Sequence, residues 1–254
     1  MLNDVKDVLI SFYRKTQDYL GKFEDLTSDK LFDEDRATRE NVKQTMLNLS
    51  ELGEYNWIVV APDMYISAYG KDRAAIDGHF LTYMAEHKDF YDKIKNRILA
   101  SEVIGRHKHI FEEIFFNIEH ENYSVACVAM SSMMDFLLTT LMNYNWSTLG
   151  VLTDKFIACS DAPTLNDDYT LSIFGYIKFL EHFMADAGGF MVYLEPQYVN
   201  RHWLVHGRMH HVLDAADTYQ LLFGLYAFVI IYESDMVRNH HSLYRMQDPE
   251  TAHI

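Results

Sequence analysis

The spacing of hydrophobic and polar residues along the chain predicts helices in five ranges. In each of them, apolar residues recur on one stripe at helical spacing, with charged or polar residues between them. The ranges are 2–20, 28–52, 75–122 (two or three helices), 169–185 and 214–238. Residues 54–70 are ambiguous. Their β-branched and aromatic residues fit a short strand, whereas Pro62 fits an extended linker that enters a helix at Asp63.

A sixth helix is predicted over residues 122–145, which are apolar on nearly every side. Asn122 is a suitable N-cap residue at its start. A helix without a polar face is typical of a position deep inside a bundle, so we expect this helix to be central and deeply buried. Its single acidic residue, Asp135, needs a partner in such a place.

The composition supports an all-α fold of about seven to nine helices. The chain has 254 residues with only 11 glycines and 4 prolines, too few for the tight turns of a strand-rich protein. We predict an N-terminal helical region over 1–100, a helical bundle over 101–238 and a C-terminal tail over 239–254.

The charge and cysteine content favour a cytoplasmic protein. With 37 acidic residues against 22 Lys and Arg, the formal net charge is -15, which argues against indiscriminate binding to nucleic acid or anionic membrane but not against a local phosphate pocket. Cys127 and Cys159 show no pairing pattern, so we expect buried free thiols. The N-terminus lacks the uninterrupted apolar stretch of a signal peptide, and the most apolar run, 219–232, is too short to span a bilayer.

A basic island stands out in this acidic chain, the sequence YVNRHWLVHGRMHH over residues 198–211, here called the motif segment. It holds two arginines and four histidines in fourteen positions, with no Asp or Glu. Asn200 is a suitable N-cap, with Arg201 in the first turn of the helix that follows. One interpretation of the segment is ordinary surface polarity, with Trp203 and its apolar neighbours in the core.

A second interpretation is a metal site. His202, His206 and His210 follow at i, i+4 and i+8, so neighbouring pairs lie on one face of a continuous helix. The outer two would lie about 12 Å apart along the axis, so all three could not share one ion. Gly207 weakens a continuous helix, and the chain has no HExxH pattern that would complete the site.

A third interpretation is phosphoryl-transfer chemistry on RNA without metal. An imidazole can take or give a proton near neutral pH, and a guanidinium matches the geometry and charge of a phosphate. Together they could deprotonate a 2′-hydroxyl and stabilise the charge on the attacked phosphate.

The residues of the motif segment also resemble a known family. Arg201, four intervening residues and His206 look like the Rx4-6H signature of HEPN-domain ribonucleases, and NRHWLVHGR is similar to the NRHxxxHG form of Apea-like HEPN proteins. Upstream, ENYSVACVAMSSMMDFLL resembles the earlier core helix of that family, with Asp135 where Glu is more usual. The resemblance covers roughly residues 105–238. It implies an all-α bundle of the HEPN type, preceded here by the additional N-terminal helical region.

The resemblance also implies roles for the main residues. His206 would be the general acid or base, and Arg201 would bind the phosphate and stabilise the transition state. His202 would position the substrate or orient the catalytic groups, and Asn200 caps the helix rather than contacting RNA. On an ideal helix, Arg201 and His206 diverge by about 140°, so a homodimer with a composite active site would bring suitable groups together.

Three more residues are supporting candidates. Arg208 and His210 either widen the phosphate site or belong to the solvated surface. Asp135 either orients Arg201 or His206, or forms a structural salt bridge.

The expected function is that of a metal-independent endoribonuclease that cleaves RNA without a cofactor. We expect it to act in the cytoplasm, in toxin–antitoxin or antiviral defence, and not at a membrane. An antitoxin or regulatory protein is a possible partner. The alternative is a non-catalytic HEPN-like module that binds RNA or protein.

Overall fold

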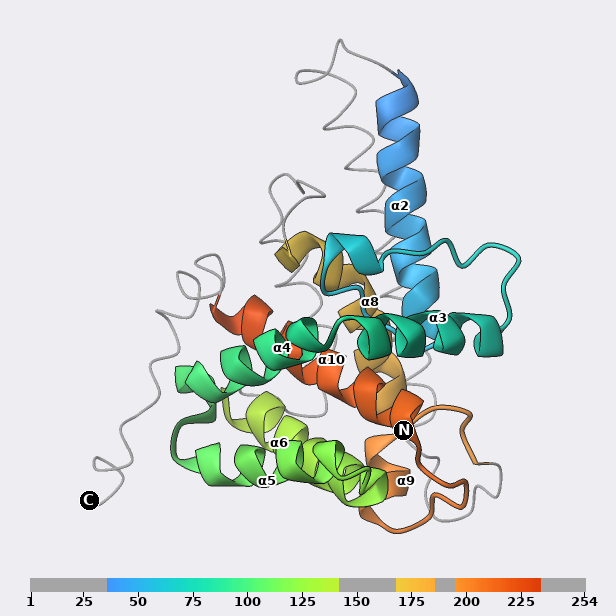
Figure 1. Cartoon of the computed structure of the whole chain (residues 1–254). Coiled ribbons are helices and arrows are strands. Elements are labelled where there is room, and N and C mark those ends of the chain that lie inside the picture. Colours follow the sequence, from blue (N-terminus) through green and yellow to red (C-terminus); the bar gives the residue numbers. More distant parts are fainter. Residues whose placement is uncertain (1–35, 142–167, 186–194, 234–254) are drawn as a thin grey trace, which may run out of the picture.

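The computed structural model describes residues 36–141, 168–185 and 195–233 (Figure 1). Within these residues the chain is helical and contains no strand, which confirms the predicted all-α class for this part. The α-helices are α2 (Arg36–Glu54), α3 (Arg73–Glu86), α4 (Lys88–Ala100), α5 (Lys108–Glu119), α6 (Tyr123–Leu141), α8 (Asp168–Phe183), α9 (Arg201–Val205) and α10 (Ala215–Glu233), and the 3-10 helices are η1 (Pro62–Met64) and η2 (Glu102–His107). The helices predicted within 28–52, 75–122, 122–145, 169–185 and 214–238 are thus present where the structure describes them, whereas 2–20 lies outside.

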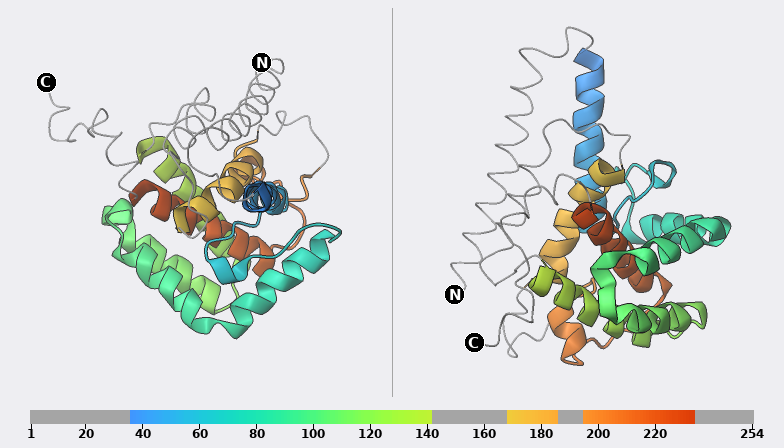
Figure 2. Two further views of the ribbon diagram at one scale, coloured as in Figure 1. Left: turned by 90° about the horizontal axis from the view of Figure 1, so that it is seen from above. Right: turned by 90° about the vertical axis from the view of Figure 1, so that its left-hand side faces the viewer.

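Helix α10 is the centre of the molecule. It contacts α8, α6, α3 and α4, and both Figure 1 and Figure 2 show it surrounded by these helices. Its N-terminus is held by two aspartates in reciprocal fashion. The Asp214 carboxylate accepts hydrogen bonds from the N–H groups of Ala216 and Asp217, and the Asp217 carboxylate accepts one from the N–H of Asp214.

Glycine allows two helices and an extended segment to approach each other closely. A Cβ at Gly53 of α2 would lie 2.6 Å from Cβ of Lys178 and 2.9 Å from the carbonyl oxygen of Gly175, both on α8. A Cβ at Gly175 would in turn lie 3.2 Å from Cα of Ile58. These contacts leave no room for a larger residue at the crossing of α2 and α8.

The ambiguous range 54–70 forms no strand, and an extended segment leads into a helix at Asp63 as the second alternative predicts, but this helix is only the short 3-10 helix η1 (Pro62–Met64). The chain is irregular and buried from Trp57 to Ala61, turns through η1, and enters α3 only at Arg73, where Asp72 caps the helix. Trp57 explains the burial, because its ring stacks on Phe80 at 4.4 Å. No strand lies among the described residues to pair with this segment, so its apolar side chains are buried between helices instead.

Helices α5 and α6 pack against each other, and α6 also contacts α10. The prediction that α6 is deeply buried is correct for the face with Ala126, Cys127 and Met130, but wrong for the opposite face. There Val125 is 57% exposed and Val128 is 42% exposed. The error arose because small and apolar residues occupy both faces, so the sequence contained no polar stripe to mark the outer one.

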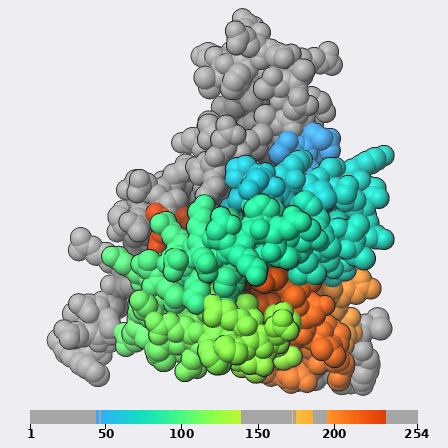
Figure 3. All heavy atoms as spheres, viewed as in Figure 1, coloured from blue at the N-terminus to red at the C-terminus, as the bar shows by residue number. Residues whose placement is uncertain are grey.

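The described helices share one hydrophobic core, which includes residues from both sides of position 100, from Leu49 to Ile231. In Figure 3, the helices α3 to α6 cover most of the face in view.

Helix α10 is long and apolar enough to cross a membrane by length and composition alone. However, 72% of its apolar stretch is buried inside the protein. That burial agrees with the predicted core helix over 219–232.

Cys127 is a buried free thiol, as predicted, and burial raises the pKa of this thiol to about 12. Cys159 lies outside the described residues.

Candidate functional site

Asn200 determines where the motif helix begins. Its side-chain oxygen accepts a hydrogen bond from the N–H of Trp203 at 3.1 Å, which confirms the predicted N-cap. Its side-chain amide donates to the carbonyl oxygens of His182 and Ala185 at 2.9 and 3.0 Å. Asn200 therefore caps the start of α9 and binds the end of α8 at the same time, and it is only 2% exposed.

The motif helix is much shorter than the metal interpretation requires. Helix α9 ends at Val205, and Gly207 takes a left-handed conformation with φ of 64°. The N–H groups of Gly207 and Arg208 then donate back to the carbonyls of Leu204 and Trp203. This is a Schellman termination, and it depends on glycine. His210 therefore lies beyond the helix, and the predicted alignment of three histidines on one continuous helix face is wrong.

Arg201 and Asp135 meet between α9 and α6. The Arg201 Nη1 donates to the Asp135 carboxylate, and the Arg201 side chain is only 13% exposed whereas that of Asp135 is 35% exposed. The lone acid of α6 thus has the partner that its apolar surroundings require. The contact fixes the direction of the guanidinium.

His206 lies on the surface at the end of α9, where it serves as C-cap residue. Its ring contacts the ring of His202 edge to face at 4.5 Å. His202 is half-buried, one turn before His206, so the two imidazoles form a pair on one side of the short helix. The structure thus brings together the predicted residues Arg201 with Asp135, and His202 with His206.

The remaining predicted residues have other contacts. The guanidinium of Arg208 lies over the ring of buried Trp203, 4.1 Å from the ring centroid. The Arg208 side chain therefore covers this ring. His210 is exposed, and its backbone N–H donates to Glu195. Neither contact involves a residue of the Arg201–Asp135 or His202–His206 pairs.

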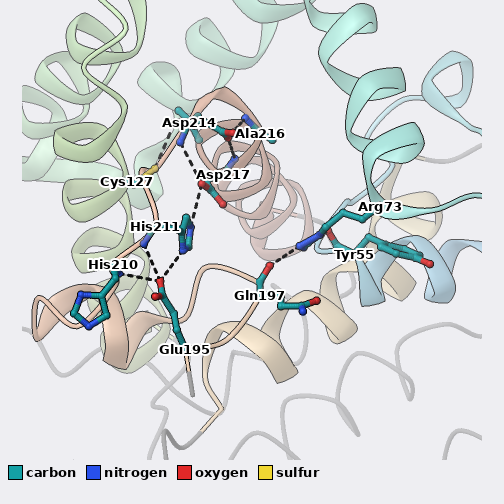
Figure 4. A network of polar contacts seen from close by, with 11 residues as sticks. Tyr55, Arg73, Cys127, Glu195, Gln197, His210, His211, Asp214, Ala216 and Asp217 are labelled. Atoms are coloured by element: carbon teal, nitrogen blue, oxygen red, sulfur yellow. Dashed lines mark hydrogen bonds and ion pairs between the residues drawn. The ribbon is translucent and has the colours of Figure 1, made fainter. Parts of the chain in front are cut away.

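A polar network that the sequence did not indicate holds the chain after α9 (Figure 4). The Glu195 carboxylate accepts hydrogen bonds from the backbone N–H groups of His210 and His211 and lies 2.7 Å from Nδ1 of His211. The other ring nitrogen of His211 lies 3.4 Å from Asp217 of α10. Although burial opposes it, the pKa of Glu195 is lowered by these donors, whereas burial raises the pKa of Asp217.

The N-terminal region also contacts the approach to the motif. Arg73, at the start of α3, donates hydrogen bonds to the carbonyl oxygens of Gln197 and Tyr55 (Figure 4). In addition, the ring of Tyr198 stacks on that of His182 at 4.2 Å. No spacing or motif marks Arg73 or Glu195, because their partners are distant in sequence. The only available signal was Glu195 itself, an acid three residues before the motif segment.

Within the described residues, no group of three or more His, Cys, Asp and Glu side chains is arranged to hold a metal ion. The described part of the chain is thus an all-helical fold with a short, capped helix, at which Arg201 pairs with Asp135 of α6 and His202 contacts His206. Comparison with known protein families, with curated proteins and with solved structures yields no match.

Proposed function

We propose that the protein is a metal-independent endoribonuclease of the HEPN type that acts in the cytoplasm, in a toxin–antitoxin or antiviral setting. The observation that carries the proposal is the arrangement at α9. A guanidinium is fixed in direction by Asp135, and an exposed imidazole, His206, lies at the other end of the same five-residue helix. The defence setting and the family come from the resemblance of the motif.

In the proposed reaction, His206 accepts the proton of an RNA 2′-hydroxyl, whose oxygen attacks the adjacent phosphorus. The bond from phosphorus to the 5′-oxygen breaks, and that oxygen takes up a proton from water, which leaves a 2′,3′-cyclic phosphate and a 5′-hydroxyl. Arg201 stabilises the additional negative charge on the phosphate oxygens, since a guanidinium is always charged and its planar fork of donors matches a phosphate. His202, in ring contact with His206, orients that imidazole.

A homodimer would complete the site. On α6, Val128, Ser132 and Asp135 follow at i, i+4 and i+7, so a partly apolar stripe leads along one face to the partner of Arg201. A second copy that covers Val125 and Val128 would bring its own motif segment close to the first. Such pairing would also gather positive charge locally in a protein of net charge -15.

The catalytic proposal is tested with single-stranded RNA in the presence of EDTA. We expect wild type to produce 2′,3′-cyclic phosphate ends, and His206→Ala to lower the rate by about 10²- to 10⁴-fold, the usual contribution of a general acid or base. Arg201→Ala should be similarly impaired. His109→Ala is the matched control, because this exposed histidine of α5 lies outside the motif segment and should keep full activity. Inert wild type, or equal cleavage by wild type and His206→Ala, would contradict the proposal.

The dimer is tested separately by light scattering on the purified chain. Val128→Glu should dissociate the dimer and abolish cleavage, because it places a charge in the proposed contact. Leu47→Glu is the control, since Leu47 is 40% exposed, about as much as Val128, and lies on α2, outside α6 and the motif segment. A wild-type monomer that cleaves RNA would show that no second copy is needed.

One observation favours a non-catalytic binding module instead. Arg201 is largely buried and its charge is already matched by Asp135, which a purely structural ion pair also requires. In that case the protein would bind RNA or a protein partner without producing cyclic phosphate ends, and the same assay separates the two functions.

A further inference from the structure

The segment 65–69, between η1 and α3, places tyrosine side chains on the surface. Exposure alternates along it, since Tyr65, Ser67 and Tyr69 face outward whereas Ile66 is half-buried and Ala68 is buried. Tyr69 is 86% exposed, the most exposed of the large hydrophobic residues described. An aromatic ring that stays this exposed contributes little to folding, so its presence there calls for another explanation.

The backbone that carries Tyr69 is fixed. The side chain of Asn48, buried in α2, donates to the carbonyl of Ile66 and accepts from the N–H of Ala68, both at 2.7 Å. The N–H of Lys71 then donates to the carbonyl of Ala68, with Gly70 at φ of 70° in the third position of this turn. A positive φ there is typical of a type II turn, which places Tyr69 at the tip. Holding the ring in place beforehand lowers the entropy lost when a ligand binds.

The turn is linked to the approach to the motif helix through Arg73. Figure 1 shows the chain between η1 and α3 making a wide excursion at the edge of the molecule before α3 begins. Arg73, two residues beyond Lys71, donates to the carbonyl of Gln197, four residues before Arg201. Lys71 forms no ion pair with any described residue, so its charge is available to an anion beside the exposed ring.

We infer that Tyr69 and Lys71 form a subsite for single-stranded RNA, in which a base stacks on the Tyr69 ring and a backbone phosphate pairs with Lys71. Stacking suits this ring because every base presents a π-face, and an adjacent cation supplies the phosphate contact. Tyr65, 37% exposed on the same side of the segment, extends the surface for a neighbouring nucleotide. The inference rests on the proposed function, because it assigns part of the substrate-binding surface of that nuclease.

The test measures RNA binding rather than cleavage. The full-length chain with His206→Ala is titrated against a fluorescent single-stranded RNA of about 12 nucleotides, and affinity is read from anisotropy. We expect Tyr69→Ala to lower the affinity roughly 5- to 100-fold and Tyr69→Phe to retain it. Lys71→Gln should reduce the slope of log affinity against log salt by about one. Phe116→Ala is the matched control, because Phe116 is 56% exposed on α5 and should bind RNA as the parent does.

Unchanged RNA affinity of Tyr69→Ala would overturn the inference. So would a Tyr69→Ala variant that binds RNA normally but no longer retains a protein partner, because the segment would then be a protein-docking surface. Failure of the nuclease proposal gives a different result. Tyr69-dependent RNA binding without cleavage by wild type in EDTA would refute the nuclease and support the RNA subsite.

Discussion

Helices α9 and α10 are neighbours in sequence, but they are held by opposite means. Thirteen of the nineteen residues of α10 are buried, and most of these are apolar. Helix α9 has five residues, of which Trp203 and Leu204 are buried, and it is fixed by its Asn200 cap, its Gly207 termination and the Arg201–Asp135 ion pair. Isolated helices this short are unstable in water, so these contacts, and not its own hydrogen bonds, give α9 its place.

The difference teaches where precision comes from in this molecule. Apolar burial is strong but non-directional, so the buried face of α10 supplies stability without orienting polar groups. Hydrogen bonds contribute about 1 kcal/mol each but fix direction, and around α9 they set the bounds of the helix and the direction of the Arg201 guanidinium. We therefore expect substitutions in the two regions to separate loss of stability from loss of activity.

The largest effect should come from the core around α10. Phe223→Ala removes a fully buried ring that contacts Trp57 and Phe80, at centroid distances of 5.8 and 6.4 Å. We expect a loss of about 3–5 kcal/mol in the free energy of unfolding, measured in urea, because the cavity cannot be filled by rigid neighbours. Phe116→Ala, the same change at a 56% exposed position, should cost less than about 1 kcal/mol. Equal costs would mean that α10 is not the core that its burial indicates.

A smaller loss of stability, with a larger effect on the site, should follow from Asn200→Ala. The change removes the cap of α9 and the two hydrogen bonds to the end of α8, a total of about 2–3 kcal/mol. Asn200→Ser keeps an oxygen for the cap and loses the amide donors, so it should cost about 1 kcal/mol less. Thermal unfolding of both variants provides the comparison. If Ser and Ala are equivalent, the cap contributes nothing and α9 is held from α8 alone.

The sequence allowed the helices to be predicted because each has a strong local signal. The apolar run of 214–238, the Asn200 cap and the glycine at 207 all depend on neighbours within a few residues. Contacts between distant segments carry no such signal. The approach of Arg73 to Gln197, the attachment of His210 and His211 to Glu195, and the burial of residues 57–61 without a partner strand depend on how the helices pack.

The exposed face of α6 shows the opposite limitation. Val125 and Val128 are as apolar as core residues, so hydrophobicity alone placed them inside. For the site, the sequence identified Asn200, Arg201, Asp135 and His206 as candidates and paired Asp135 with Arg201 or His206. It could not indicate Glu195 or Asp217, because a carboxylate beside a histidine becomes visible only once both have been placed in space.

The smallest expected effect is a dependence of stability on acid pH. It concerns Glu54, which contacts the side chain of His182, the residue whose carbonyl oxygen accepts a hydrogen bond from Asn200. Its carboxylate lies 3.3 Å from Nε2 of His182 and 3.0 Å from Nζ of Lys178. His182 and, against the effect of burial, Lys178 lower the pKa of Glu54 from 4.5 to about 2. Since the folded pKa lies below the unfolded one, the stabilisation is present above about pH 4.5 and is lost as the pH falls towards 2.

Glu54→Gln tests this dependence by comparing urea unfolding at pH 7 and at decreasing pH. The Glu54 side chain is half exposed, so solvent screening reduces its contribution, and we expect the variant to be about 1 kcal/mol less stable at pH 7. That difference should shrink below pH 4.5 as wild type becomes protonated. Glu51→Gln, at an exposed position one turn earlier on α2, should match wild type throughout. A gap between Glu54→Gln and wild type that stays constant with pH would show that Glu54 stabilises α2 through packing and not through its charge.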